Sequence, residues 1–158
     1  MTTLTRIQMV VYLQAIDLFT YCTAEQMVRI ASIAQQQDFT AGDEIYAASD
    51  PADAMYCIAE GHVSLVANDG TTRREVGSKE IFGVSEILSD RLRGENARAT
   101  QDTVALVIDA EDFFDLLSNN IEIVKALFRT VLRTPQENAL PSESTQAQAK
   151  SAGDHATT

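Results

Sequence analysis

Cysteine and histidine are scarce in this sequence, and long apolar runs are missing. The two cysteines, Cys22 and Cys57, lie in apolar surroundings, so we expect small core residues rather than a disulfide pair. Neither His62 nor His155 stands near other metal-ligand types, and no CxxC or Cys/His spacing occurs. These absences argue against a metal enzyme, because such a site needs a cluster of histidine and carboxylate ligands.

No targeting or membrane segment is evident either. The N-terminus lacks the basic region and uninterrupted apolar stretch of a signal peptide. No segment reaches the roughly 18 apolar residues that a membrane-spanning helix needs. We therefore expect a soluble, cytoplasmic protein that does not insert into a membrane.

Basic residues are few: 12 Lys and Arg stand against 23 Asp and Glu, and the formal net charge is −11. A chain this acidic is repelled by phosphate backbones, which argues against nucleic acids and anionic membranes as partners. Arg91, Arg93 and Arg98 are the exception, because they bring three cations close together. Two interpretations stay open for them: a solvated surface loop, or a local attraction for an anion.

Helical patterns stand at both ends of an apolar-rich chain. Periodicity predicts a helix over residues 4–16, and the Thr23–Gln26 capping box opens a second helix. Near the other end, Asp109 can cap a helix that runs to Leu117, and residues 121–132 form a clear amphipathic helix. Residues 134–158 have almost no large apolar side chain, so we expect a disordered tail there.

The middle of the chain is β-like. Short runs of β-branched and aromatic residues are separated by turn residues from Gln37 to Ile108, which predicts a sandwich or barrel. Asn68-Asp69-Gly70 is typical of a hairpin turn. Residues 103–108 are typical of a strand that is buried on both faces or lies in the core of a sandwich.

Six motifs, in order, resemble the cyclic nucleotide-binding domain family of catabolite activator protein and protein kinase A regulatory subunits. They are Leu18-Phe19 with 27–31, Phe39-x-x-Gly42-x-x-Ile45, 55–63, 76–83, Asp102-Thr103 and 112–117. The resemblance covers about residues 4–133. It implies an α+β fold, mainly a β jelly roll (a cupin-like double-stranded β-helix), flanked by N-terminal and C-terminal helices. The implied domain is 1–133, with helices at 4–34, the β-roll at 35–109 and C-terminal helices at 110–133.

Residues 81–88 and 98–100 resemble the family's phosphate-binding cassette, which reads roughly F-G-E-L-A-L-L, a few loop residues, then P-R-x-A-T. In the family, the Glu binds the ribose 2′-hydroxyl and the Arg pairs with the cyclic phosphate. A Phe-Gly step into a short helix directs backbone N–H groups at a phosphate. The ligand-binding residues that this resemblance implies are Phe82, Gly83, Val84, Ser85, Glu86, Arg98, Ala99 and Thr100.

Two positions depart from the family pattern. Val84 stands where the Glu belongs, and Ala97 stands where the Arg belongs when one counts back from Ala99-Thr100. Arg98 comes one position later, so on a strand it points to the opposite face unless a bulge re-aims it. Glu86 either substitutes for the missing Glu through a two-residue register slip or is a solvated carboxylate. With both contacts altered, we do not expect tight binding of cyclic AMP or cyclic GMP.

The resemblance implies a non-catalytic regulatory or sensor module, and two versions stay open. In the first, cyclic nucleotide binding is lost or altered, and the module acts through protein contacts and a movable C-terminal helix. Phe113, Phe114 and Leu117 are the residues expected to carry that movement. In the second, the chain is a genuine sensor of cyclic AMP, cyclic GMP or another small phosphate-bearing ligand, which the Gly83 amides bind together with Arg91, Arg93 or Arg98.

The partners expected from the sequence are proteins. Transcription factors of the family place a helix-turn-helix domain after the C-terminal helix, whereas the residues after Arg133 are polar and carry one Lys. Direct DNA binding is therefore not expected. We expect a protein partner, a larger parent protein or a homodimer.

Overall fold

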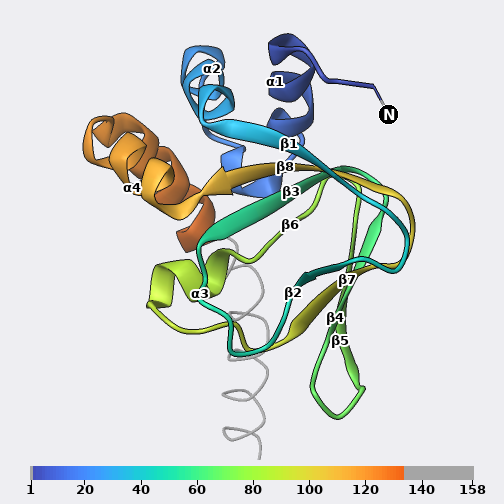
Figure 1. Ribbon diagram of the computed structural model, residues 1–158. Coiled ribbons are helices and arrows are strands. Elements are labelled where there is room, and N and C mark those ends of the chain that lie inside the picture. Colours follow the sequence, from blue (N-terminus) through green and yellow to red (C-terminus); the bar gives the residue numbers. More distant parts are fainter. Residues whose placement is uncertain (1, 134–158) are drawn as a thin grey trace, which may run out of the picture.

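Two four-stranded antiparallel sheets form the body of the structure, and helices cover one face of the first sheet (Figure 1). The computed structural model describes residues 2–133, so the predicted tail at 134–158 lies outside the described residues. The strands are β1 Ala34–Phe39, β2 Glu44–Tyr46, β3 Ala54–Glu60, β4 His62–Val66, β5 Thr72–Gly77, β6 Ile81–Phe82, β7 Asn96–Ala99 and β8 Thr103–Asp109. The helices are α1 Arg6–Gln14, the 3-10 helix η1 Asp17–Phe19, α2 Ala24–Ser32, α3 Val84–Ser89 and α4 Ala110–Ser118, and residues 121–133 are also helical.

Local capping sets the helix boundaries. The Thr23 hydroxyl accepts from the Gln26 N–H, and the Gln26 side chain accepts from the Thr23 N–H, so the predicted capping box is confirmed. Asp109 accepts from two N–H groups of the first turn of α4, as predicted. None of the helices in the described part of the chain is long and apolar enough to cross a membrane.

The strand order confirms the predicted jelly roll. The first sheet has the order β1-β8-β3-β6 and the second β2-β7-β4-β5. The predicted hairpin turn at Asn68-Asp69-Gly70 joins β4 to β5. Strand β8 lies between β1 and β3 and pairs with both, which explains its continuous run of apolar residues.

The first sheet separates two cores because its side chains alternate between its faces. Met55, Leu106 and Ile108 face the helices and pack with residues such as Phe19 and Phe113. The interior of the roll is lined by the alternate residues of the strands, including Phe39, Tyr56, Ile58, Leu65, Val76, Phe82, Ala97 and Ala99.

The cysteines fit this interior as the sequence predicts. Both are free thiols in the described structure, and Cys57 is fully buried among the helix-facing core residues. Burial raises the pKa of the Cys57 thiol to about 12, so the thiol is neutral and behaves as a small apolar residue.

Gly61 provides a test of the corner between β3 and β4. Its φ is +113°, and an added Cβ would lie 2.4 Å from Thr103 Oγ1 and 2.6 Å from Thr103 Cα. We expect Gly61→Ala to lower the free energy of unfolding by about 3 kcal/mol, from left-handed strain plus a clash. Gly70→Ala is the matched control, because Gly70 has φ +89° but nothing within 4 Å of the new Cβ. If urea denaturation showed the same loss of free energy of unfolding in both variants, the close packing of Gly61 against Thr103 would be contradicted.

Candidate functional site in the cassette

The frame of the cassette forms as predicted at the junction of β6 and α3. Gly83 is the N-cap of α3 with φ +84°, a conformation that favours glycine. An added Cβ at Gly83 would meet Arg93 Nη1 at 3.0 Å and Ala54 O at 3.3 Å, so the close approach also requires glycine. Phe82 is buried, and its ring stacks on Tyr56 with the centroids 5.0 Å apart.

Arg93 is buried in this frame, with its side chain only 1% exposed. Its Nη1 donates to the Gly83 carbonyl at 2.8 Å and to Glu86 Oε1 at 2.9 Å, and its Nη2 donates to the Ala54 carbonyl. The guanidinium carbon lies 4.2 Å from the centre of the Tyr46 ring. The interpretation as a solvated loop is therefore wrong for Arg93, because its guanidinium is buried and its hydrogen bonds and ring contact replace those it would make with water.

Glu86 supplies the counter-charge. Its side chain is 14% exposed, and its second carboxylate oxygen accepts from Ser85 Oγ at 3.0 Å. The expectation of a solvated carboxylate is wrong, and so is the register slip. The next residue, Ile87, stays buried in the core while Glu86 turns toward Arg93.

Of the second half of the predicted site, Ala99 lies in the same buried cluster as Phe82, whereas Arg98 and Thr100 do not join the first half. On β7, Ala97 and Ala99 are fully buried and face the roll interior, whereas Arg98 is exposed on the outer face of the second sheet. There it faces Ser64 and Glu44 on the neighbouring strands, as strand alternation predicts. Thr100 Oγ1 lies 2.7 Å from His62 Nδ1, away from α3. Of the predicted ligand residues, the structure brings together the consecutive residues Phe82 to Glu86, with Ala99 in the roll interior in the same buried cluster as Phe82.

The sequence named Arg93 only as one of three arginines that could attract an anion, whereas the structure places Arg93 alone of the three in the buried frame of the cassette. The loop after α3 is longer than the corresponding loop in the family pattern. Counting back from Ala99-Thr100 assigns the extra residues to the segment before the family's arginine, which puts Ala97 at the arginine position. If the extra residues are assigned to the segment between Arg93 and Ala97 instead, Arg93 occupies the arginine position. Its spacing from the intact Phe82-Gly83 step was the available signal.

Aromatic rings surround the Arg93 guanidinium on the side that faces the interior of the roll. Tyr46 lies 6.1 Å from Phe82 and 6.0 Å from Tyr56, measured between ring centroids. Burial raises the pKa of both tyrosine phenols, and the charge of Arg93 opposes that rise. Neutral rings around the pair exclude water, which strengthens the attraction between Arg93 and Glu86.

The buried Arg93–Glu86 pair allows a prediction about the free energy of unfolding of single and double variants. Arg93→Met leaves a buried carboxylate without its partner, so we expect the free energy of unfolding to fall by about 3 kcal/mol. The double variant Arg93→Met with Glu86→Leu should recover most of that loss, because an apolar pair replaces an ion pair at little net cost.

Arg91→Ala is the control for that experiment, since Arg91 is exposed and its Nε donates only to Ser89 Oγ. We expect a change within about 0.5 kcal/mol in guanidinium chloride denaturation. If Arg93→Met behaved like Arg91→Ala, the buried pair would not exist in solution.

Comparison with known proteins shows which family has this architecture. The family described as "Cyclic nucleotide-binding domain" matches residues 36–120. An uncharacterised NTE family protein of Mycobacterium tuberculosis is 28% identical over 109 residues, which cover 69% of this chain and 19% of that protein. A putative cyclic nucleotide-binding protein from Geobacter metallireducens GS-15 is 26% identical with a TM-score of 0.68, over 83% of this chain and 95% of that chain.

A third structure is more distant in sequence. It is the regulatory subunit of a cAMP-independent protein kinase A from Trypanosoma brucei, as a mutant bound to cAMP. It is 19% identical with a TM-score of 0.69, over 90% of this chain and 51% of that chain. The chain spans about a fifth of the length of the mycobacterial relative. Since the family match covers more than half of the chain, this protein belongs to the cyclic nucleotide-binding domain family and has the fold of its regulatory domains.

Proposed function

We propose that this chain is a non-catalytic regulatory module in which Glu86 has taken the place of the cyclic phosphate on Arg93. The observation that carries the proposal is the buried pair, with Arg93 Nη1 2.9 Å from Glu86 Oε1. The cassette is then closed by a group of the protein itself. Cyclic AMP and cyclic GMP do not act as its ligands at physiological concentrations.

Electrostatics opposes a phosphate at this position. An anion that approaches Arg93 meets the Glu86 carboxylate, and two like charges 4 Å apart repel by about 4 kcal/mol at an effective dielectric constant near 20. Displacing Glu86 instead would break a buried ion pair, which costs about 3–5 kcal/mol. Either cost corresponds to a loss of at least about a hundredfold in affinity.

The ribose contact is missing as well. Val84, at the position of the family's Glu, is apolar and packs against the helix-facing core. It lines an apolar cavity of about 120 Å³ together with Leu88, residues of α4 such as Phe113 and Leu117, and residues of the 121–133 helix. Val84 therefore serves packing between α3 and the C-terminal helices rather than recognition of a ribose hydroxyl.

The Trypanosoma brucei subunit supports the assignment of Glu86. The form that binds cAMP carries a glutamate-to-alanine substitution and, seven residues later, a threonine-to-arginine substitution. In this chain, Glu86 and Arg93 are also seven residues apart. This chain already has the arginine, and it retains a glutamate at the matching separation.

The module would act through contacts with proteins in the cytoplasm, either within a larger parent protein or on a partner, and not on DNA. The apolar cavity joins α3 to α4 and the 121–133 helix, so a shift of α3 would reach the C-terminal helix by direct packing. Phe113 is buried at this junction and Leu117 lines it, whereas Phe114 is partly exposed beside Glu86 and Leu92.

Titration calorimetry with cyclic AMP and cyclic GMP tests the proposal. We expect no saturable binding to the wild-type chain at millimolar ligand. The double variant Glu86→Ala with Val84→Glu frees Arg93 and restores a carboxylate for the ribose, so we expect it to bind at least about tenfold more tightly than the wild type. Glu95→Ala, which removes a carboxylate from the same loop outside the pair, is the matched control.

Micromolar binding to the wild type would contradict the proposal. If Arg93→Lys then abolished that binding, the chain would be a genuine sensor that uses Arg93. The Nε of Arg93 has no hydrogen-bond partner among the described residues, and this observation favours the sensor as the second candidate function.

A further inference from the structure

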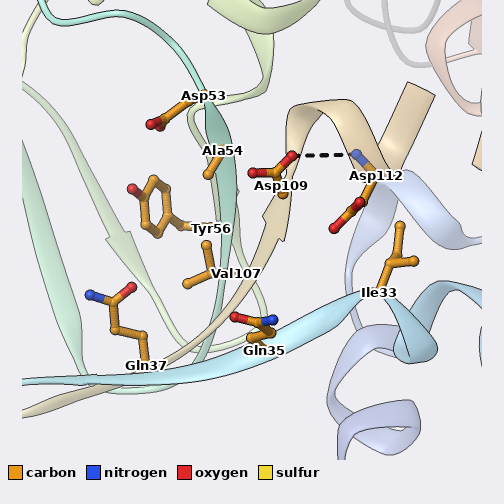
Figure 2. Close-up of a pocket in the computed structure, with 9 residues that line it drawn as sticks. All are labelled: Ile33, Gln35, Gln37, Asp53, Ala54, Tyr56, Val107, Asp109 and Asp112. Atoms are coloured by element: carbon orange, nitrogen blue, oxygen red, sulfur yellow. Dashed lines mark hydrogen bonds between the residues drawn. The ribbon is translucent and has the colours of Figure 1, made fainter. Parts of the chain in front are cut away.

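A second cavity, of about 300 Å³, lies where β1, β3 and β8 meet the start of α4 (Figure 2). Its lining holds three carboxylates, two side-chain amides and one phenol, and no Lys, Arg or His. The lining residues are Ile33, Gln35, Gln37, Asp53, Ala54, Tyr56, Val107, Asp109 and Asp112. The cavity is therefore rich in hydrogen-bond acceptors and negative in charge.

The Tyr56 hydroxyl is left without a partner at this cavity. Tyr56 is 8% exposed, and its hydroxyl makes no hydrogen bond within residues 2–133. Figure 2 shows the ring projecting from β3 on the same side as Asp53 and Gln37. Burial raises the pKa of the phenol; the positive charge of Arg93 opposes that rise, and the negative charge of Asp53 adds to it. The hydroxyl is accessible and has no hydrogen-bond partner within residues 2–133, so it is available to a ligand.

The acceptors around it also have spare capacity. Asp109 Oδ1 caps α4 by accepting from the N–H groups of Glu111 and Asp112. The side chains of Asp53 and Asp112 take part in no salt bridge or hydrogen bond in the described part of the chain. Three carboxylates on the lining of one cavity, with no cationic side chain on that lining, favour a positive partner.

We propose that this cavity binds a small aliphatic diamine. Each ammonium group carries three N–H donors and no acceptor, which complements carboxylates, amide oxygens and a phenol oxygen. A cavity of this volume is at the lower end of the range for small-molecule sites. A single metal ion fits less well, because no group of three His, Cys, Asp or Glu side chains in the described structure converges to hold one.

The occupant would connect two parts of the fold. One ammonium group lies between Asp53 and the Tyr56 hydroxyl on β3, and the other lies beside Asp112 and the free oxygen of Asp109 at the start of α4. The diamine would thus tie α4 to the edge of the roll. The cavity adjoins the cassette through Ala54, whose carbonyl accepts from Arg93, but none of its three carboxylates pairs with Arg93 in the described structure.

The test is calorimetric titration of the full chain with putrescine, with 1,4-butanediol and Mg²⁺ as comparison probes. Saturable binding of putrescine is expected, with 1,4-butanediol and Mg²⁺ at least about tenfold weaker. Asp53→Asn should weaken putrescine binding about tenfold, and Tyr56→Phe about threefold. The ring of Tyr56→Phe still stacks on Phe82, so this variant keeps the roll intact.

Asp115→Asn is the matched control, because it removes one carboxylate from α4 outside the cavity. It should leave putrescine affinity within about twofold of the wild type. Equal losses in Asp53→Asn and Asp115→Asn would mean general attraction to an acidic protein and would overturn the proposal. Absence of saturable binding, or equal binding of Mg²⁺ and putrescine, would overturn it as well.

Discussion

A buried guanidinium must be paired, and the arrangement around the cassette follows from that constraint. Arg93 joins three segments: the Ala54 carbonyl at the start of β3, the Gly83 carbonyl at the end of β6, and Glu86 on α3. Tyr46 on β2 covers its face. One side chain thus connects the two sheets of the roll with the cassette helix, and its charge is balanced from within the chain.

The proposed function of the module rests on the same pair. In a site of this type a free arginine attracts phosphate, whereas an arginine already bound to a carboxylate does not. Because α3 is held by Arg93 on one side and packs against the C-terminal helices on the other, the position of α3 is set by protein contacts. The family match describes the fold of this domain, and the function proposed above makes contacts with its helices, rather than a nucleotide, the event that switches it.

Most of the fold could be predicted from the sequence because it depends on local signals. The Thr23–Gln26 capping box, the Asn68–Gly70 hairpin and the apolar run of β8 each act over a few residues, and each is present in the structure. Strand alternation alone also gave the outward direction of Arg98. The pairing of Arg93 with Glu86 was not predictable in this way. It depends on the Ala54 carbonyl, 39 residues away in sequence, and on where the extra loop residues are placed.

The most direct test of the account is nitrogen-15 NMR of the arginine guanidinium groups in the wild-type chain. We expect one guanidinium, assigned to Arg93, whose N–H groups exchange slowly with water and whose signals stay unchanged in millimolar cyclic AMP. Signals of Arg93 that exchange as fast as those of Arg91, or that shift in a saturable way with cyclic AMP, would contradict it.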